Sequence, residues 1–183
     1  MAKLKLEKWI YRWRVRTGSF CVILIVVLAK PNIRFLLGSV GICSIGLLIR
    51  AWASGHLVKE KELAISGPYQ YTRNPLYFGN LILGIGVAMG ANSWAALVIF
   101  LAYFSLFYPF VIKREIERMK ELFPEKYDEY KKRVPLFFPS FRHGSPSNSR
   151  FSWSLYMKNK EYRALLGTVL FGLLLMGKML LFH

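Results

Sequence analysis

The longest charge-free stretch of the chain, residues 74–112, contains 39 residues without Lys, Arg, Asp or Glu. A helix that crosses a bilayer needs about 20 predominantly apolar residues, so this stretch is long enough for two spans. Gly90-Ala91-Asn92-Ser93 lies near its middle and has the composition of a turn. The stretch therefore predicts a tight hairpin of two membrane helices and argues against an ordinary soluble domain.

Three further apolar runs cover residues 17–29, 35–49 and 164–183. The first two are short for a bilayer, but flanking Lys and Arg side chains can reach the headgroups and Trp residues can lie at the interface. The first run is followed by Lys30-Pro31 instead of a small-residue cleavage site, so we interpret it as a retained span and not a signal peptide. We therefore predict an all-α integral membrane protein with about five transmembrane helices.

The distribution of basic residues predicts the orientation. With a cytoplasmic N-terminus, the inside segments are 1–16, 50–73 and 113–163, and they hold 23 of the 26 Lys and Arg residues. The outside keeps three: Lys30, Arg34 and Lys178. Such a bias is typical of cytoplasmic loops. It predicts that both polar segments of interest, before the third span and after the fourth, face the cytoplasm.

The net charge of +16 does not indicate a nucleic-acid partner, because the basic residues flank the apolar runs and do not form one face of a soluble domain. Cys21 and Cys43 lie inside apolar runs without a metal-ligand spacing, so we expect small buried side chains and no metal site. Gly86 and Gly90 suit close helix packing, within one chain or between two, which leaves the oligomeric state open. Catalytic motifs of hydrolases, zinc enzymes and P-loop proteins are absent.

Two polar segments flank the hairpin. In the first, SGPYQYTRNPLYFG (66–79), Ser66-Gly67-Pro68 indicates a turn, and Asn74-Pro75 indicates a helix start with Asn as N-cap. Taken alone, its tyrosines are typical of an interfacial aromatic belt. The second, residues 113–134, carries an apolar stripe at helical spacing that predicts two short helices with a break at Phe123-Pro124. Residues 142–150 have the composition of a flexible connector.

Together these segments resemble the isoprenylcysteine carboxyl methyltransferase family, which belongs to a wider set of membrane methyltransferases that includes phospholipid methyltransferases. The resemblance rests on GHLVKEKELAISGPYQYTRNPLYFG, on Glu115 after the helical hairpin, and on LFPEKYDEYKKRVP, and it covers about half of the chain, from 49 to 139. It implies a helical membrane enzyme that uses S-adenosylmethionine. It also implies a cytosolic cofactor pocket formed by the loop before the third span and the helical segment after the fourth.

Carried over position by position, the resemblance implies a set of site residues. Arg73 and Glu115 match catalytic positions. The positions that match cofactor contacts are Lys59, Lys61, Glu62, Leu63, Ala64, Tyr69, Asn74, Pro75, Leu76, Tyr77 and Glu115.

Two positions depart from the family. Asn74 stands where the family usually has His, and an amide can donate and accept hydrogen bonds but gives no proton-transfer role. Val111 stands where eukaryotic members carry a substrate-contacting arginine, with Lys113 and Arg114 nearby.

We therefore expect an S-adenosylmethionine-dependent methyltransferase acting on a lipophilic or membrane-bound acceptor, such as the carboxylate of an isoprenylcysteine-like substrate. The alternatives are a phospholipid N-methyltransferase, an NADPH-dependent membrane reductase of the sterol-reductase type, and a non-catalytic protein whose basic face binds anionic lipid. We expect one membrane domain, 1–183, with a helical hairpin (1–48), a catalytic core (49–140), a connector (141–162) and a last transmembrane helix (163–183).

Overall fold

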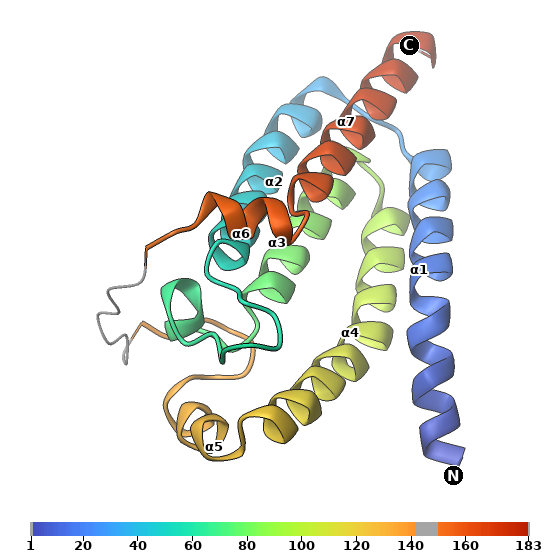
Figure 1. Ribbon diagram of the computed structural model, residues 1–183. Helices are drawn as coiled ribbons and strands as arrows, with labels where there is room; N and C mark the ends of the chain where they lie inside the picture. Colours follow the sequence, from blue (N-terminus) through green and yellow to red (C-terminus); the bar gives the residue numbers. More distant parts are fainter. Residues whose placement is uncertain (1, 142–149, 183) are drawn as a thin grey trace.

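The computed structural model describes the backbone of residues 2–141 and 150–182, and the side chains of residues 13–141 and 150–181. Most of the predicted connector, 142–149, lies outside the described residues. Every secondary-structure element of the described residues is a helix, as predicted (Figure 1). Its elements are α1 (Ala2–Leu28), α2 (Ile33–Ser54), the short 3₁₀ helix η1 (Gly67–Gln70), α3 (Pro75–Gly90), α4 (Trp94–Leu122), α5 (Pro124–Arg133), α6 (Trp153–Lys158) and α7 (Tyr162–Phe182).

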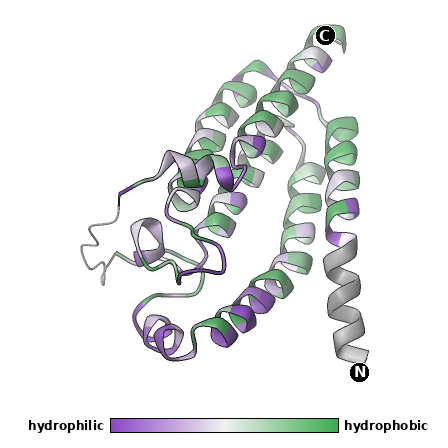
Figure 2. Ribbon diagram, viewed as in Figure 1, coloured by the Kyte–Doolittle hydropathy of each residue, from purple (hydrophilic) through white to green (hydrophobic). Residues whose placement is uncertain are grey.

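Three helices are long and apolar enough to cross a membrane: α2, α4 and α7. The fourth apolar helix, α3, has 16 residues and is shorter. The first predicted span lies within α1, whose charge-free part is short for a bilayer, so a full crossing by this segment stays a prediction. Figure 2 shows the apolar residues along α2, α3, α7 and the first half of α4, with the polar residues gathered on the end of α4 and on α5.

The predicted hairpin is confirmed: α3 ends at Gly90 and α4 begins at Trp94. Asn92 in the turn adopts φ 47°, a left-handed conformation that asparagine tolerates better than most residues. Its amide donates to the Lys30 carbonyl over 3.0 Å, and the Lys30 N–H donates to the Ala91 carbonyl over 2.9 Å. The α1–α2 and α3–α4 connections are therefore joined at one end of the helical bundle, and the start of α3 lies at the other.

Helices α2 and α3 approach each other closely through glycine. A Cβ placed on Gly46 would lie 2.8 Å from the Leu83 nitrogen and 2.9 Å from the Gly79 carbonyl oxygen. A Cβ on Gly86 would lie 2.6 Å from the Cys43 sulfur. Gly86 therefore mediates packing within the chain, one of the two alternatives that its spacing left open.

The C-terminal helix is joined to this pair by a buried ion pair. Arg50 Nε in α2 lies 2.6 Å from Glu161 Oε1, just before α7, and a second guanidinium nitrogen donates to the Asn80 side chain in α3. At the other end of α7, the Lys178 ammonium donates to the carbonyls of Val26 and Val27 in α1, over 2.9 and 2.7 Å. Polar contacts therefore hold α7 at both of its ends.

The prediction of two short helices after the fourth span is half right. The helix break at Phe123 and the new helix at Pro124 are confirmed. The first short helix does not exist as a separate element, because α4 continues without interruption from Trp94 to Leu122. Extending a helix adds one hydrogen bond for each residue, whereas starting a new one is unfavourable. A change from apolar to charged residues therefore does not end α4.

Candidate functional site

A pocket of ≈ 570 Å³ opens at the end of the bundle where α3 begins. Its walls come from the loop after α2, from η1 and the first turn of α3, and from the last third of α4, with α5 closing one side. We call it the central pocket. Ten of the predicted site residues line it: Lys59, Glu62, Leu63, Ala64, Tyr69, Arg73, Asn74, Leu76, Tyr77 and Glu115.

Two predicted residues lie elsewhere. Pro75 is fully buried behind the wall, where it occupies the first position of α3. Its ring suits that position, because the first N–H of a helix has no partner within the helix. Lys61 is exposed and lines a neighbouring pocket instead. The structure therefore does not bring these two side chains to the central pocket.

The side chains of Tyr77 in α3 and Glu115 in α4 both line the pocket and interact with each other. Glu115 is exposed within the open pocket, and Lys59 and Arg14 also interact with it electrostatically. The Tyr77 ring packs edge-on against Tyr108 at 5.5 Å. A negative charge is thus held beside an aromatic wall that continues along α4 into the apolar part of the bundle.

Two buried tyrosines, Tyr69 and Tyr130, also line the pocket. The Tyr130 hydroxyl in α5 donates to the Tyr69 backbone carbonyl in η1 over 2.7 Å. Burial, followed by the nearby Glu115 carboxylate, raises the pKa of Tyr69 well above its ordinary value. Burial likewise raises the pKa of Tyr130, against a smaller opposing effect of Arg73. Both phenols are therefore neutral at physiological pH.

Arg73 reaches the pocket from the segment between η1 and α3. Its backbone N–H donates to the Pro135 carbonyl over 3.0 Å, and Nη1 donates to the Tyr127 hydroxyl over 3.1 Å. The guanidinium also lies 6.0 Å from the centre of the Tyr127 ring. Its Nε is buried and has no hydrogen-bond partner within the described residues. A buried donor of this kind costs free energy unless it meets an acceptor.

Asn74 occupies the N-cap position of α3, as predicted, but its side chain does not cap the helix. The amide Nδ2 instead donates to the Leu136 carbonyl over 2.8 Å. Thr72 makes a parallel contact, because its hydroxyl donates to the Phe137 carbonyl over 2.8 Å. Asn74 is therefore the N-cap residue by position, while its side chain attaches the segment after α5 to the pocket wall.

Several lining residues were not among the predicted site residues. From α4 and α5 these are Val111, Arg114, Ile116, Arg118, Met119, Tyr127 and Tyr130, and from the loop they are Leu57, Val58 and Glu60. The apolar stripe of residues 113–134 contained a signal for four of them, because Ile116, Met119, Tyr127 and Tyr130 all belong to it. That stripe packs around Leu63 of the loop. Val111 is buried in the wall, so the position of the eukaryotic arginine presents an apolar surface.

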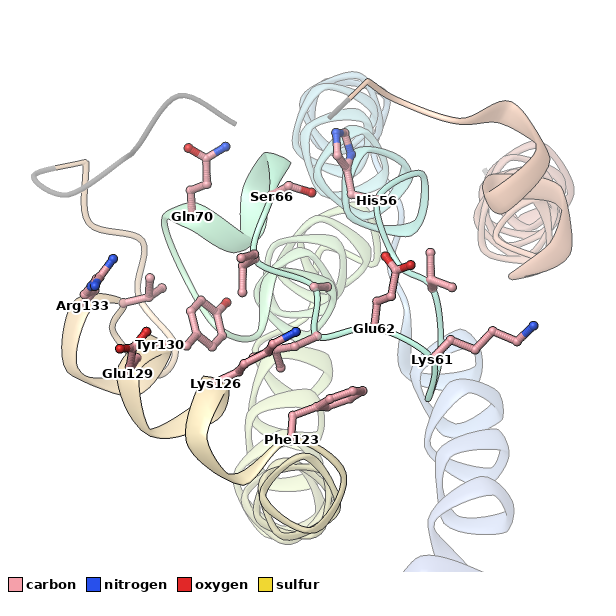
Figure 3. Close-up of a pocket in the computed structure, with 15 residues that line it drawn as sticks. His56, Lys61, Glu62, Ser66, Gln70, Phe123, Lys126, Glu129, Tyr130 and Arg133 are labelled. Carbon is pink, nitrogen blue, oxygen red and sulfur yellow. The ribbon is translucent and has the colours of Figure 1, made fainter. Parts of the chain in front are cut away.

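A second pocket, of ≈ 780 Å³, adjoins the first and shares five lining residues with it: Val58, Glu62, Leu63, Ala64 and Tyr130. Figure 3 shows it between α5, which contributes Lys126 and Glu129, and the loop after α2, which contributes Lys61 and Glu62. It contains neither Tyr77 nor Glu115. The central pocket therefore contains most of the predicted site residues.

Among the described residues, no group of three or more His, Cys, Asp and Glu could hold a metal ion.

Comparison with known proteins identifies a family. A family model described as phospholipid methyltransferase matches residues 35–126, half of the chain. The cobalt-zinc-cadmium resistance protein CzcN of Cupriavidus metallidurans is 36% identical over 105 residues, which cover 56% of this chain and 48% of that protein. The nickel-cobalt-cadmium resistance protein NccN of Alcaligenes xylosoxydans is 36% identical over 92 residues, 49% and 43% of the two chains. The matches thus span about half the length of these relatives, and no solved structure matches.

Proposed function

The chain belongs to the phospholipid methyltransferase family of membrane proteins, and from this membership we propose that it is an S-adenosylmethionine-dependent methyltransferase that acts on a lipophilic or membrane-bound acceptor. The charge distribution of the sequence further supports a central pocket that faces the cytoplasm.

The observation that carries the proposal is the meeting of Tyr77 and Glu115 in a pocket at the ends of apolar helices. The loop after α2 contributes the charged side chains of Lys59, Glu60 and Glu62 to the pocket. Apolar lining comes from Leu76 in the first turn of α3 and from Val111, where the apolar part of α4 ends. Such a pocket suits a reaction in which a charged cofactor arrives from water and an apolar acceptor arrives from the membrane.

The residues present fit the proposed cofactor. The volume of ≈ 570 Å³ lies within the range of about 300–1,000 Å³ that is usual for small-molecule pockets. Glu115 would pair with the amino group of the cofactor through a charge-assisted hydrogen bond. The guanidinium of Arg73, which lines the pocket, would hold its carboxylate. The faces of Tyr69 and Tyr77 suit a sulfonium cation.

When bound, the cofactor would supply an electrophilic methyl group to the acceptor, with a neutral thioether as the leaving group. The protein has to align the two partners and limit the access of water. Asn74 takes no part in proton transfer. A carboxylate acceptor is already ionised near neutral pH and needs no base.

The proposal is tested by cofactor binding in detergent and by transfer of a labelled methyl group. We expect S-adenosylmethionine and its demethylated product to raise the melting temperature of the purified protein, and NADPH to leave it unchanged. The acceptor panel contains prenyl-thiol acids, phosphatidylethanolamine and small thiols. Stabilisation by NADPH alone would indicate a reductase, and no saturable binding of either cofactor would indicate a non-catalytic protein.

Glu115→Gln and Glu117→Gln provide a matched pair for the site. Both glutamates are exposed on α4, but Glu117 pairs with Lys113 at 3.7 Å and does not line the pocket. A lost charge-assisted hydrogen bond of about 1.5–3 kcal/mol should weaken cofactor binding roughly ten- to a hundredfold in Glu115→Gln. Glu117→Gln should bind as the unmodified protein does. Equal affinities in the two variants would contradict the assigned site.

A further inference from the structure

Five large apolar side chains are exposed beside the end of α2 that lies near the central pocket. They are Trp52 (42% exposed), Phe138 (70%), Phe141 (79%), Trp153 (72%) and Met157 (57%). We call them the aromatic rim. Only Trp52 belongs to a helix long enough to span a membrane, so the other four are apolar surfaces on segments outside the bundle. Large exposed apolar side chains gathered in one region indicate a contact with another molecule or with lipid.

The first part of the rim is held against α2 and α3. The Ser140 N–H donates to the Tyr71 carbonyl over 2.9 Å. The Phe141 ring lies 5.0 Å from the Tyr71 ring, which in turn lies 6.1 Å from Trp52. Phe138 packs edge-on against Phe78 in the first turn of α3, at 6.4 Å. The segment 138–141 is therefore fixed at the level where α2 ends and α3 begins.

The second part of the rim, α6, is held at the same level. The Ser152 N–H donates to the Gly55 carbonyl over 3.0 Å, and the Asn159 amide donates to the carbonyls of Ser54 and Leu57, over 2.9 Å each. Three residues after α6 ends, Glu161 pairs with Arg50. This short helix thus lies between the end of one predicted span, α2, and the start of another, α7. Trp153 and Met157 are four residues apart and share one face of it.

The position of the rim favours lipid over a protein partner. Exposed apolar side chains also lie on the spans themselves, such as Leu48 (69% exposed), one turn before Trp52 in α2, and Leu166 (61%) in α7. These must face hydrocarbon if α2 and α7 cross a bilayer. Tryptophan and phenylalanine suit the boundary between headgroups and acyl chains. Lys158, Lys160 and Arg163 are exposed nearby and suit anionic headgroups.

We propose that the aromatic rim is seated in the headgroup–acyl boundary of the bilayer, so that α6 and the segment 138–141 are interfacial elements bound to the membrane surface beside the pocket. The segment has a direct connection to the site, because the carbonyl of Leu136 accepts the Asn74 amide in the pocket wall. Lipid contact at the rim therefore holds one wall of the central pocket at the membrane surface.

The proposal is tested on the full chain in liposomes by spin labels at single cysteines. Cys21→Ser and Cys43→Ala remove the native thiols, and Phe138→Cys, Phe141→Cys and Trp153→Cys are then made one at a time. Collision rates with oxygen, which concentrates in lipid, and with a water-soluble nickel chelate are compared at each position. Leu166→Cys on α7 is the lipid reference, and Lys132→Cys, exposed on α5, is the aqueous reference.

We expect the ratio of oxygen to nickel collisions at all three rim positions to lie near that of the lipid reference. A ratio near the aqueous reference would overturn the proposal. Protection from both reagents would also overturn it, because it would indicate a protein partner or a second copy of the chain.

A second measurement avoids the cysteine substitutions. The difference in tryptophan fluorescence between the unmodified chain and Trp153→Phe isolates the emission of Trp153. Phospholipids brominated on the acyl chains should quench this emission, and aqueous iodide should not. Quenching by iodide alone would place Trp153 in water.

Discussion

The Tyr130 hydroxyl donates a 2.7 Å hydrogen bond to the backbone carbonyl of Tyr69, and this bond joins α5 to η1 beside the central pocket. The two residues are separated by 61 positions in the sequence, and both are buried. Both side chains line that pocket, so the bond holds two parts of its wall together.

Tyr130→Phe should lower the stability of the protein and weaken cofactor binding. Loss of the donor leaves a buried carbonyl without its partner, at a cost of about 1–3 kcal/mol. The melting temperature in detergent and the affinity for S-adenosylmethionine measure the two effects. Tyr156→Phe in α6, away from the pocket, is the matched control and should change the affinity little. An unchanged melting temperature in Tyr130→Phe would show that the bond does not stabilise the fold.

Asn74→Asp should be more destabilising than Asn74→Ala at about pH 8, where a carboxyl group is ionised. The ionised group would face the Leu136 carbonyl, so two acceptors would meet where a donor and an acceptor meet now. A protonated carboxyl can donate to that carbonyl. Burial at this position favours the neutral form of a carboxyl group, so the penalty should shrink as the pH falls towards about 5 and below.

Thermal unfolding of the two Asn74 variants across this pH range checks the prediction. The difference between Asn74→Asp and Asn74→Ala should decrease steadily from high to low pH. A difference independent of pH would mean that the side chain at this position does not face the carbonyl.

Breaking the ion pair between Arg50 and Glu161 should be strongly destabilising. Glu161→Gln leaves the buried guanidinium without its counter-charge, which typically costs about 3–5 kcal/mol. Replacing both residues together, as in Arg50→Leu with Glu161→Leu, should cost less than the sum of the two single changes, because no unpaired charge stays behind. The free energies of unfolding of the single and double variants in detergent give the coupling energy between Arg50 and Glu161. For comparison, Glu117→Gln in the exposed pair with Lys113 should cost at most about 1 kcal/mol.

Gly46→Ala should disturb the packing of α2 on α3. The added methyl group would lie 2.8 Å from the backbone nitrogen of Leu83, so the two helices would have to separate. Overpacking of this kind costs about 1–3 kcal/mol. Gly167→Ala in α7 is the control, since a Cβ there meets nothing within 4 Å, and its melting temperature should stay the same or rise. Equal melting temperatures of the two variants would contradict the close approach of α2 and α3.

Local signals in the sequence were sufficient for much of the fold. The hairpin turn at Gly90, the start of α3 at Pro75 and the break at Phe123 all follow from residue types that favour one backbone conformation. The end of the fourth span was harder to predict. The change from apolar to charged residues after Ile112 alters the environment of the side chains but does not interrupt the backbone hydrogen bonds of α4.

The sequence by itself determined that the chain is a set of apolar helices with polar segments gathered at one end, because hydrophobic periodicity and charge act over short distances along the chain. Only the tertiary structure decided which partners those segments take. The Asn74 amide donates to the carbonyl of Leu136, 62 positions away, and Arg50 pairs with Glu161, 111 positions away. Each of these side chains has a plausible local role, as a cap or a flanking charge. The distant partner depends on how the helices pack, and a local sequence pattern does not contain that information.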